Sequence, residues 1–89
     1  MISRTTSKFW KLYKQLDSKT QAQSRSAYAL FAKNPGHPSL KFKKVHANRP
    51  IYSARINLDF RVVGILEKNE IVWFWVGPHD IYDKLIARL

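Results

Sequence analysis

The sequence predicts an α+β domain in which an N-terminal helical hairpin packs on one face of a small antiparallel sheet, with a short C-terminal helix. Two observations lead to this prediction. Apolar residues recur at helical spacing in the first part of the chain, whereas after residue 50 they alternate as they do in strands. The chain has 89 residues, of which 45% are hydrophobic. This is enough for one packed core and too little for two, so residues 1–89 are expected to form a single domain.

The first two elements are expected to be helices. Residues 7–16 carry an apolar stripe at positions i, i+3, i+4 and i+7, after Thr5-Thr6 as the start signal. The stripe consists of Phe9, Leu12, Tyr13 and Leu16. Ser18 and Gln21 match a capping box, which predicts a second helix over residues 19–33 that an Asn-Pro-Gly sequence ends. Together these segments form the predicted helical hairpin.

The strands are expected to begin with a charged edge strand and to continue as two hairpins. In residues 40–45 apolar side chains alternate with lysines, which is typical of an exposed edge. A loop at Asn57-Leu58-Asp59 then sets Arg55 opposite Arg61. A second hairpin turns at Lys68-Asn69. Its facing pairs are Leu66 with Ile71, Gly64 with Trp73, and Arg61 with Val76.

Alternation along these strands divides their side chains between two faces. The core face is expected to carry Tyr52, Ala54, Ile56, Phe60, Val62, Gly64, Leu66, Ile71, Trp73 and Trp75. The opposite face, expected to be partly open, carries Ser53, Arg55, Arg61, Val63, Ile65, Val72, Phe74 and Val76. We expect Trp73 and Trp75 to pack in the core, which leaves Phe74 as the better candidate for stacking on a base. Residues 79–89 complete the fold as a short amphipathic helix, whose apolar residues are Ile81, Leu85 and Ile86.

Arg55 and Arg61 should lie side by side on the partly open face, with His79 just beyond the end of the next strand. Like charges that oppose one another destabilise a sheet unless a negative group lies between them. Two explanations are open. One is an external phosphate, and the other is an internal carboxylate from Asp59, Glu67, Asp80 or Asp83. The first explanation makes this face an anion-binding site.

The chain is strongly basic, and the excess charge is confined to one half. The formal net charge is +10, and residues 1–50 hold 11 Lys and Arg against one acidic residue. Residues 51–89 hold 5 basic and 5 acidic residues. A surface of this sign attracts RNA, DNA or an acidic protein partner, although solubility alone is a simpler reason for such a charge.

Several kinds of site are not expected. The chain has no cysteine, which excludes disulfides and cysteine-based metal sites. His37 and His46 lack partners at metal-ligand spacing, so neither a metal ion nor another cofactor is expected. The first residues carry no apolar signal region and no segment could span a bilayer. We therefore expect a cytoplasmic protein with no membrane partner.

Four short blocks resemble, in this order, small toxins of the RelE/ParE superfamily of type II toxin–antitoxin systems. They are His37–Phe42, Tyr52–Ile56, Phe60–Gly64 and Ile71–Gly77. The resemblance covers residues 7–86 and implies the RelE-like fold. Members of that superfamily usually open with a full β-strand before the helix pair. Only residues 1–6 are available for it here, so the first strand is expected to be short or absent.

The resemblance also implies roles for individual residues. Arg55 and Arg61 match two strand arginines of the family, and the second of these is catalytic in RNA-cleaving members. His79 falls where YoeB-like toxins carry a catalytic histidine, and Tyr82 approximately matches the late catalytic tyrosine of RelE-like toxins. Gly77-Pro78 replaces the arginine with which RelE-like toxins end the last strand. The implied catalytic residues are therefore Arg61, His79 and Tyr82.

Two functions remain open within the superfamily. RelE-like and YoeB-like members cleave mRNA in the ribosomal A site, whereas ParE-like members poison DNA gyrase without cutting RNA. The resemblance favours a metal-independent, ribosome-dependent mRNA endoribonuclease that is neutralised by a cognate antitoxin. The alternative is a non-enzymatic gyrase inhibitor that acts through the helical hairpin. For the nuclease, the expected RNA-binding residues are Arg55, Lys41, Lys43, Lys44 and Phe74.

Overall fold

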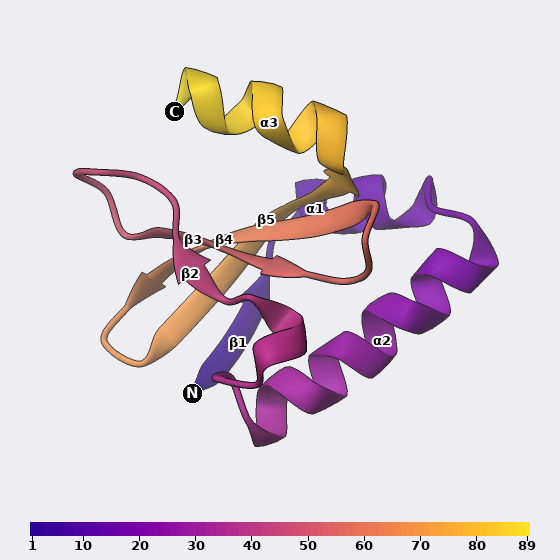
Figure 1. Ribbon diagram of the computed structural model, residues 1–89, viewed down its shortest axis with the longest axis horizontal. Helices are drawn as coiled ribbons and strands as arrows, with labels where there is room; N and C mark the ends of the chain where they lie inside the picture. The colour runs from indigo at the N-terminus through magenta and orange to yellow at the C-terminus, as the bar shows by residue number, and fades with distance from the viewer.

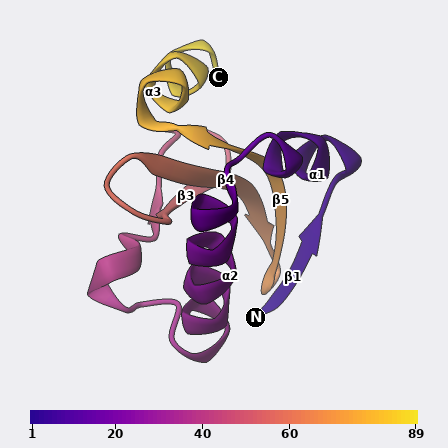
Figure 2. The same ribbon diagram turned by 90° about the vertical axis from the view of Figure 1, so that its right-hand side faces the viewer.

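The computed structural model describes residues 1–89 and arranges them in three layers (Figure 1). Helices α1 (Ser7–Lys14) and α2 (Ser18–Lys33) pack on one face of a sheet, and helix α3 (His79–Arg88) packs on the other. In Figure 2, α2 lies in front of the sheet. The predicted α+β class, with its helical hairpin and its short C-terminal helix, is confirmed. None of the three helices combines the length and the apolar character needed to cross a membrane.

The sheet has five strands in the order β1-β5-β4-β3-β2. Their bounds are Ile2–Thr5 for β1, Lys43–Lys44 for β2, Ile51–Arg55 for β3, Phe60–Glu67 for β4 and Glu70–Pro78 for β5. The short β1 pairs in parallel with β5, and all other pairs are antiparallel. The first strand therefore exists, and it adds a parallel edge to the predicted antiparallel sheet.

The strand predicted over residues 40–45 is reduced to the two residues of β2. Pro38–Leu40 forms a single 3₁₀ turn, η1, and Lys41 follows it with a left-handed φ of 45°. A residue in the left-handed region cannot continue an extended strand, so pairing with β3 starts only at Lys43.

Both hairpin helices begin at a side chain that accepts a backbone N–H. Thr6 Oγ1 accepts from Phe9 N at 3.1 Å, and Asp17 Oδ1 accepts from Thr20 N at 2.7 Å. The prediction of Ser18 as the cap of α2 is therefore wrong by one residue. Asp17 is the last extended residue, with ψ of 164°, and a capping residue must lie outside the helix.

The first predicted hairpin register is confirmed, and the second holds up to a β-bulge. Arg55 pairs with Arg61 across β3 and β4. Phe74 is an extra residue on β5, without a partner in β4. Every pair beyond it is shifted by one position, so Arg61 faces Gly77 and not Val76 as predicted. The two tryptophans that flank the bulge consequently lie on opposite faces of the sheet.

Each face of the sheet has its own core. The hairpin-side core, under α1 and α2, consists of Phe9, Phe31, Leu40, Ala54, Ile71, Trp73 and Val76. The α3-side core consists of Ile51, Val63, Trp75 and Tyr82. Trp73 and Trp75 are each 6% exposed, which confirms that they are packing residues. The bulge nevertheless moves Trp75 off the predicted core face and moves Val76 onto it.

The second face of the sheet, which the alternation pattern predicted to be partly open, is partly covered. Helix α3 covers it with Tyr82, and with Leu85 and Ile86 at the margin of the α3-side core. Ile81, predicted to be part of the apolar face of this helix, is 43% exposed. Tyr82 therefore makes the buried contact of α3, and Arg55 and Arg61 lie at the end of the sheet where α3 begins.

Candidate active site

One short loop brings Arg61 and His79 to the same end of the sheet. The loop is Asn57–Asp59, between β3 and β4. Arg61 is the second residue of β4 and pairs with Gly77 of β5, two residues before His79. His79 is the first residue of α3, and its backbone N–H donates to the carbonyl of Asp59 at 2.7 Å. The structure thus places Arg61 and His79 at the same end of the sheet, as the sequence predicted.

Neither arginine of the pair has a carboxylate partner. Arg61 Nη1 donates to the carbonyls of Asn57 at 2.7 Å and Phe60 at 3.0 Å, and Arg55 Nε donates to the carbonyl of Ser39 at 3.2 Å. The side-chain ion pairs of the molecule are elsewhere, between Arg4 and Glu70 and between His79 and Asp83. The hypothesis that an internal carboxylate lies between Arg55 and Arg61 is therefore wrong. Backbone carbonyls hold both cations in place without neutralising them.

The surroundings of Arg61 disfavour its own positive charge. Burial lowers the pKa of the Arg61 guanidinium below its ordinary value, and the charge of Arg55 lowers it further. Tyr82, Asp83 and Asp59 act in the opposite direction and do not compensate. An arginine still carries its proton at neutral pH, so the result is a half-buried cation whose charge the protein compensates only in part.

His79 lies at the surface and is held by a carboxylate one helical turn later. Its side chain is 49% exposed, and its Nδ1 lies 3.3 Å from Oδ2 of Asp83. A histidine that donates from Nδ1 to a carboxylate keeps the lone pair on Nε2. The strand pattern indicated Asp83 only as a partner for the arginines. Its i, i+4 spacing from His79 is the signal that could have identified the pair.

Tyr82, the third predicted catalytic residue, is buried. Its side chain belongs to the α3-side core, and its hydroxyl donates to Oγ of Ser53 at 3.0 Å. The ring centroid lies 6.0 Å from that of His79. Tyr82 therefore lies beneath the arginine and histidine pair, with its hydroxyl already engaged inside the protein.

The predicted RNA-binding residues fall into two groups. Lys41, Lys43 and Lys44 are exposed along η1 and the edge strand β2, next to Arg55, whose side chain bonds to η1. Phe74 is only half-exposed at the bulge, where it packs against the α3-side core. The lysines and Arg55 form one basic edge, whereas Phe74 comes from a different strand of the sheet.

The other two histidines fix the backbone of their own loops. His37 Nδ1 accepts from Ser39 N at 3.2 Å, and His46 Nδ1 accepts from Arg49 N at 2.9 Å. No three histidine, cysteine or carboxylate side chains lie close enough together to hold a metal ion. The chemistry available at the sheet end is therefore that of Arg61, His79 and their neighbours.

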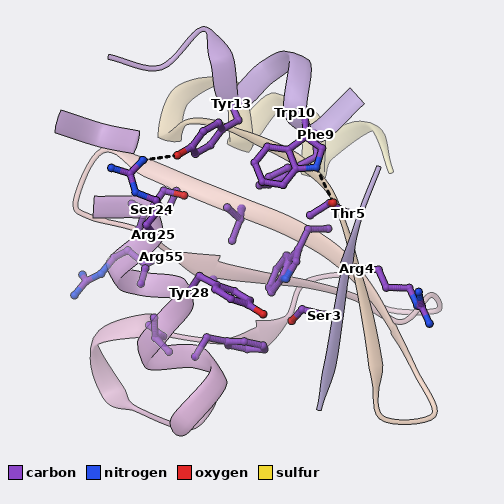
Figure 3. Close-up of a pocket in the computed structure, with 17 residues that line it drawn as sticks. Ser3, Arg4, Thr5, Phe9, Trp10, Tyr13, Ser24, Arg25, Tyr28 and Arg55 are labelled. Atoms are coloured by element: carbon purple, nitrogen blue, oxygen red, sulfur yellow. Dashed lines mark hydrogen bonds between the residues drawn. The ribbon is translucent and has the colours of Figure 1, made fainter. Parts of the chain in front are cut away.

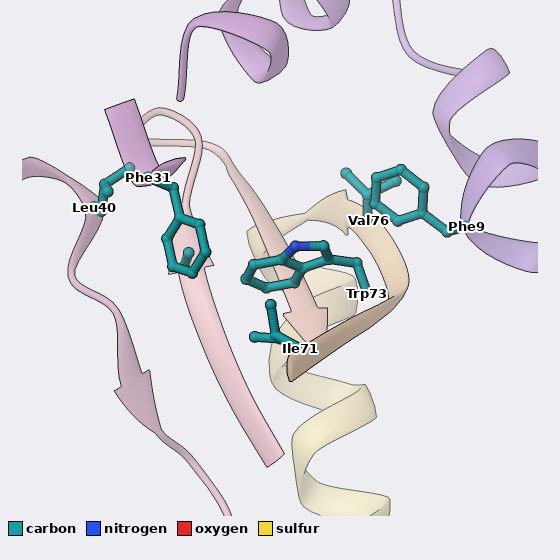
Figure 4. Packing of buried hydrophobic residues seen from close by; sticks show 7 residues of the cluster. Phe9, Phe31, Leu40, Ile71, Trp73 and Val76 are labelled. Atoms are coloured by element: carbon teal, nitrogen blue, oxygen red, sulfur yellow. The ribbon is translucent and has the colours of Figure 1, made fainter. Parts of the chain in front are cut away.

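A second feature, on the opposite face, is an apolar groove of about 590 Å³ between α1, α2 and the sheet (Figure 3). Its floor includes part of the hairpin-side core, where Trp73 lies between Phe31 and Phe9 (Figure 4). Trp10 and Tyr28 line it while remaining 47% and 54% exposed. Its charged lining residues are Arg4, Arg25 and Arg55, without any acidic residue.

Comparison with known proteins places this arrangement in a family. A model of the ParE-like toxin domain matches residues 18–84. Among solved structures, YafQ from E. coli strain BL21(DE3) is 13% identical with a TM-score of 0.72, covering 90% of this chain and 94% of that one. The RelB-RelE antitoxin-toxin complex of Methanococcus jannaschii contains a chain that is 16% identical with a TM-score of 0.73, covering 91% and 96%.

A third structure, a YoeB/ParE toxin from Agrobacterium tumefaciens, is 15% identical with a TM-score of 0.69, covering 89% of this chain and 99% of that one. At such identities these likenesses concern the fold. No curated protein sequence matches the chain significantly.

Proposed function

The chain belongs to the family of ParE-like toxin domains, the toxins of toxin–antitoxin systems, and we propose that it is a metal-independent endoribonuclease that cleaves mRNA on the ribosome. Membership confirms the resemblance seen in the sequence. One observation carries the finer proposal. Arg61, a cation without a carboxylate partner, and His79, a surface histidine held by Asp83, meet at one end of the sheet.

The proposed reaction needs a base, an acid and fixed positive charge. The 2′-oxygen of a ribose forms a bond to the adjacent phosphorus, and the bond from phosphorus to the 5′-oxygen of the next nucleotide breaks. The 2′-hydroxyl gives up a proton, and the 5′-oxygen receives one, which leaves a 2′,3′-cyclic phosphate and a 5′-hydroxyl. Negative charge accumulates on the phosphoryl oxygens during the displacement, where fixed cations stabilise it.

The residues at the sheet end fit these roles. Arg61, with Arg55 beside it, supplies the positive charge for the phosphoryl oxygens, and the carbonyls that hold Arg61 orient its guanidinium in advance. His79 supplies the acid or base through Nε2, because Nδ1 faces Asp83. Tyr82 contributes by positioning through its buried ring, because its hydroxyl is already bonded to Ser53. Lys41, Lys43 and Lys44 hold the RNA backbone.

Primer extension on a defined mRNA translated in vitro tests this proposal. Wild-type protein is expected to cut within codons only while ribosomes translate, and Arg61→Ala and His79→Ala are each expected to lose the cuts. Arg88→Ala is the matched control, because it removes an exposed cation from the far end of α3. Full cleavage by both site variants would show that the assignment is wrong even within this family.

A second function, gyrase inhibition without cleavage, is favoured by the ParE-like family match and by the exposed aromatic side chains of the hairpin. In this alternative α1 and α2 bind DNA gyrase, and Arg61 and His79 have no chemical role. A supercoiling assay with purified protein separates the two. Inhibition of gyrase while translated mRNA stays intact would favour the alternative.

A cognate antitoxin is the partner that either function requires. The RelB-RelE chain above was solved as an antitoxin–toxin complex, as was YafQ of E. coli with DinJ. For this chain we propose that an acidic, amphipathic antitoxin segment places its apolar side in the groove and its carboxylates on Arg25 and Arg55, the two lining arginines that have no carboxylate partner. Charge complementarity supports this placement, because the groove carries no acidic residue of its own.

A further inference from the structure

Asn57, at the start of the loop between β3 and β4, organises that loop through its side-chain oxygen. Its Oδ1 accepts the backbone N–H of Asp59 at 2.8 Å and that of Phe60 at 2.9 Å. An asparagine that bonds in this way to the backbone ahead of it fixes the loop in one turn conformation. The conformation of the whole connection therefore depends on one amide group.

The same loop holds both proposed catalytic groups through its carbonyls. The carbonyl of Asn57 itself accepts from Arg61 Nη1 at 2.7 Å, and that of Asp59 accepts the N–H of His79 at 2.7 Å. Two carbonyls that lie two residues apart thus fix the relative placement of the guanidinium and of the first residue of α3. A change in the loop would move both groups.

The nitrogen of the Asn57 side chain reaches a third element. Its Nδ2 donates to Oε1 of Gln23 in α2 at 2.7 Å, across 34 positions in the sequence. No other hydrogen bond joins α2 to a strand or to a loop between strands. Since Oδ1 is engaged with two backbone donors, the amide nitrogen faces Gln23 and donates to its side-chain oxygen.

We propose that Asn57 is a positioning residue for the reaction, and that through Gln23 it couples the placement of Arg61 and His79 to the position of α2. The proposal rests on the nuclease function proposed above. Helix α2 forms one wall of the apolar groove and is hydrogen-bonded to Asn57 through Gln23. Asn57 in turn fixes the loop that is bonded to Arg61 and His79. Movement of α2 is thereby transmitted to the chemistry on the other face of the sheet.

Amide hydrogen exchange of His79, followed by NMR, tests the positioning role without reference to activity. The first N–H groups of a helix usually lack a partner and exchange fast, whereas this one is bonded to the loop. Asn57→Ala is expected to speed its exchange about tenfold, as the loss of a hydrogen bond or two would. Asn48→Ala, an exposed asparagine in the loop between β2 and β3, is the control. Exchange at Val63 in the α3-side core reports global unfolding and should not change.

Kinetics and a second pair of variants test the coupling. Asn57→Ala is expected to lower kcat about tenfold with little change in KM, because the Lys-rich edge that holds RNA is intact. Gln23→Ala removes only the link to α2, and adding it to Asn57→Ala should lower kcat no further than Asn57→Ala alone. Unchanged His79 exchange and unchanged kcat in Asn57→Ala would overturn the positioning role, and additive effects of the pair would overturn the coupling. If wild type does not cleave RNA at all, the nuclease proposal fails while the exchange result still decides the role of Asn57 in the loop.

Discussion

The two functional regions of the molecule are built in opposite ways. At the sheet end, short hydrogen bonds from one loop fix Arg61 and His79, and the chain itself supplies every contact that orients them. On the other face, α2 is joined to the sheet side by one hydrogen bond and leaves a groove with exposed aromatic side chains. Chemistry needs groups fixed in advance, whereas a docking surface can be completed by its partner. This difference is what we expect if the proposed cleavage takes place in the first region and the proposed antitoxin binds to the second.

The largest effect is expected from Arg61→Ala. Removing a fixed charge from the phosphoryl oxygens should lower the cleavage rate about 100- to 1,000-fold. Binding of the antitoxin should change little, because Arg61 does not line the groove. Single-turnover cleavage and antitoxin titration, done on the same preparation, measure both. Equal losses in the two assays would mean that the regions are not separate.

Trp10→Ala is expected to weaken antitoxin binding and to leave the cleavage rate unchanged. Its indole is half-exposed in the groove, and truncation of an aromatic anchor typically costs about 2 kcal/mol of binding, or about 30-fold in Kd. Titration with the cognate antitoxin measures this, and cleavage by the free toxin should stay at the wild-type rate. Ser7→Ala, at the exposed start of the same helix, is the control.

The elements that the sequence predicted correctly are those that local patterns determine. The apolar stripe of α1 and the turn at Lys68-Asn69, with φ of 50° and 66°, follow from spacing and turn chemistry alone. The opposition of Arg55 and Arg61 follows from the length of one loop. Strand register and loop length are therefore sufficient to predict that Arg61 and His79 lie at the same end of the sheet.

The features that the sequence did not predict depend on tertiary contacts. Next to the bulge at Phe74, Gly64 pairs with Trp73, and a Cβ on Gly64 would come within 2.9 Å of the indole ring. A strict alternation pattern cannot signal an extra residue. The covering of the second face by α3 and the burial of Tyr82 likewise arise from packing between distant segments. This is why one of three catalytic candidates lies beneath the site.

A moderate effect is expected from Asp83→Asn at the sheet end. The amide no longer favours a proton on Nδ1 of His79, so the population with a free lone pair on Nε2 falls. We expect about a tenfold loss in kcat with KM unchanged, and Asp83→Glu should restore part of it. Nitrogen chemical shifts of the His79 ring show the tautomer directly. Unchanged shifts would mean that Asp83 does not orient the ring.

Tyr82→Phe should affect stability more than cleavage. It removes the hydrogen bond to Ser53 within the α3-side core, at a cost of about 1 kcal/mol in unfolding free energy. The ring and its packing remain, so the cleavage rate should stay within about twofold if Tyr82 acts by positioning alone. Chemical denaturation and the cleavage assay measure the two quantities. A large loss of activity at unchanged stability would instead mean that the hydroxyl reaches the RNA.

The smallest effect concerns the wall of the groove and depends on pH. The hydrogen bond from Thr20 N holds the pKa of Asp17, the cap of α2, below its ordinary value of 3.8. A carboxylate whose pKa is lower in the folded state stabilises the fold above that ordinary value, and the contribution is lost as the pH falls through the folded pKa. Asp17→Asn keeps a capping oxygen without the charge, so its Tm should lie slightly below wild type at pH 7 and converge with it as the pH falls through the folded pKa of Asp17. A wild-type advantage that persists in acid would mean that it does not come from the charge of Asp17.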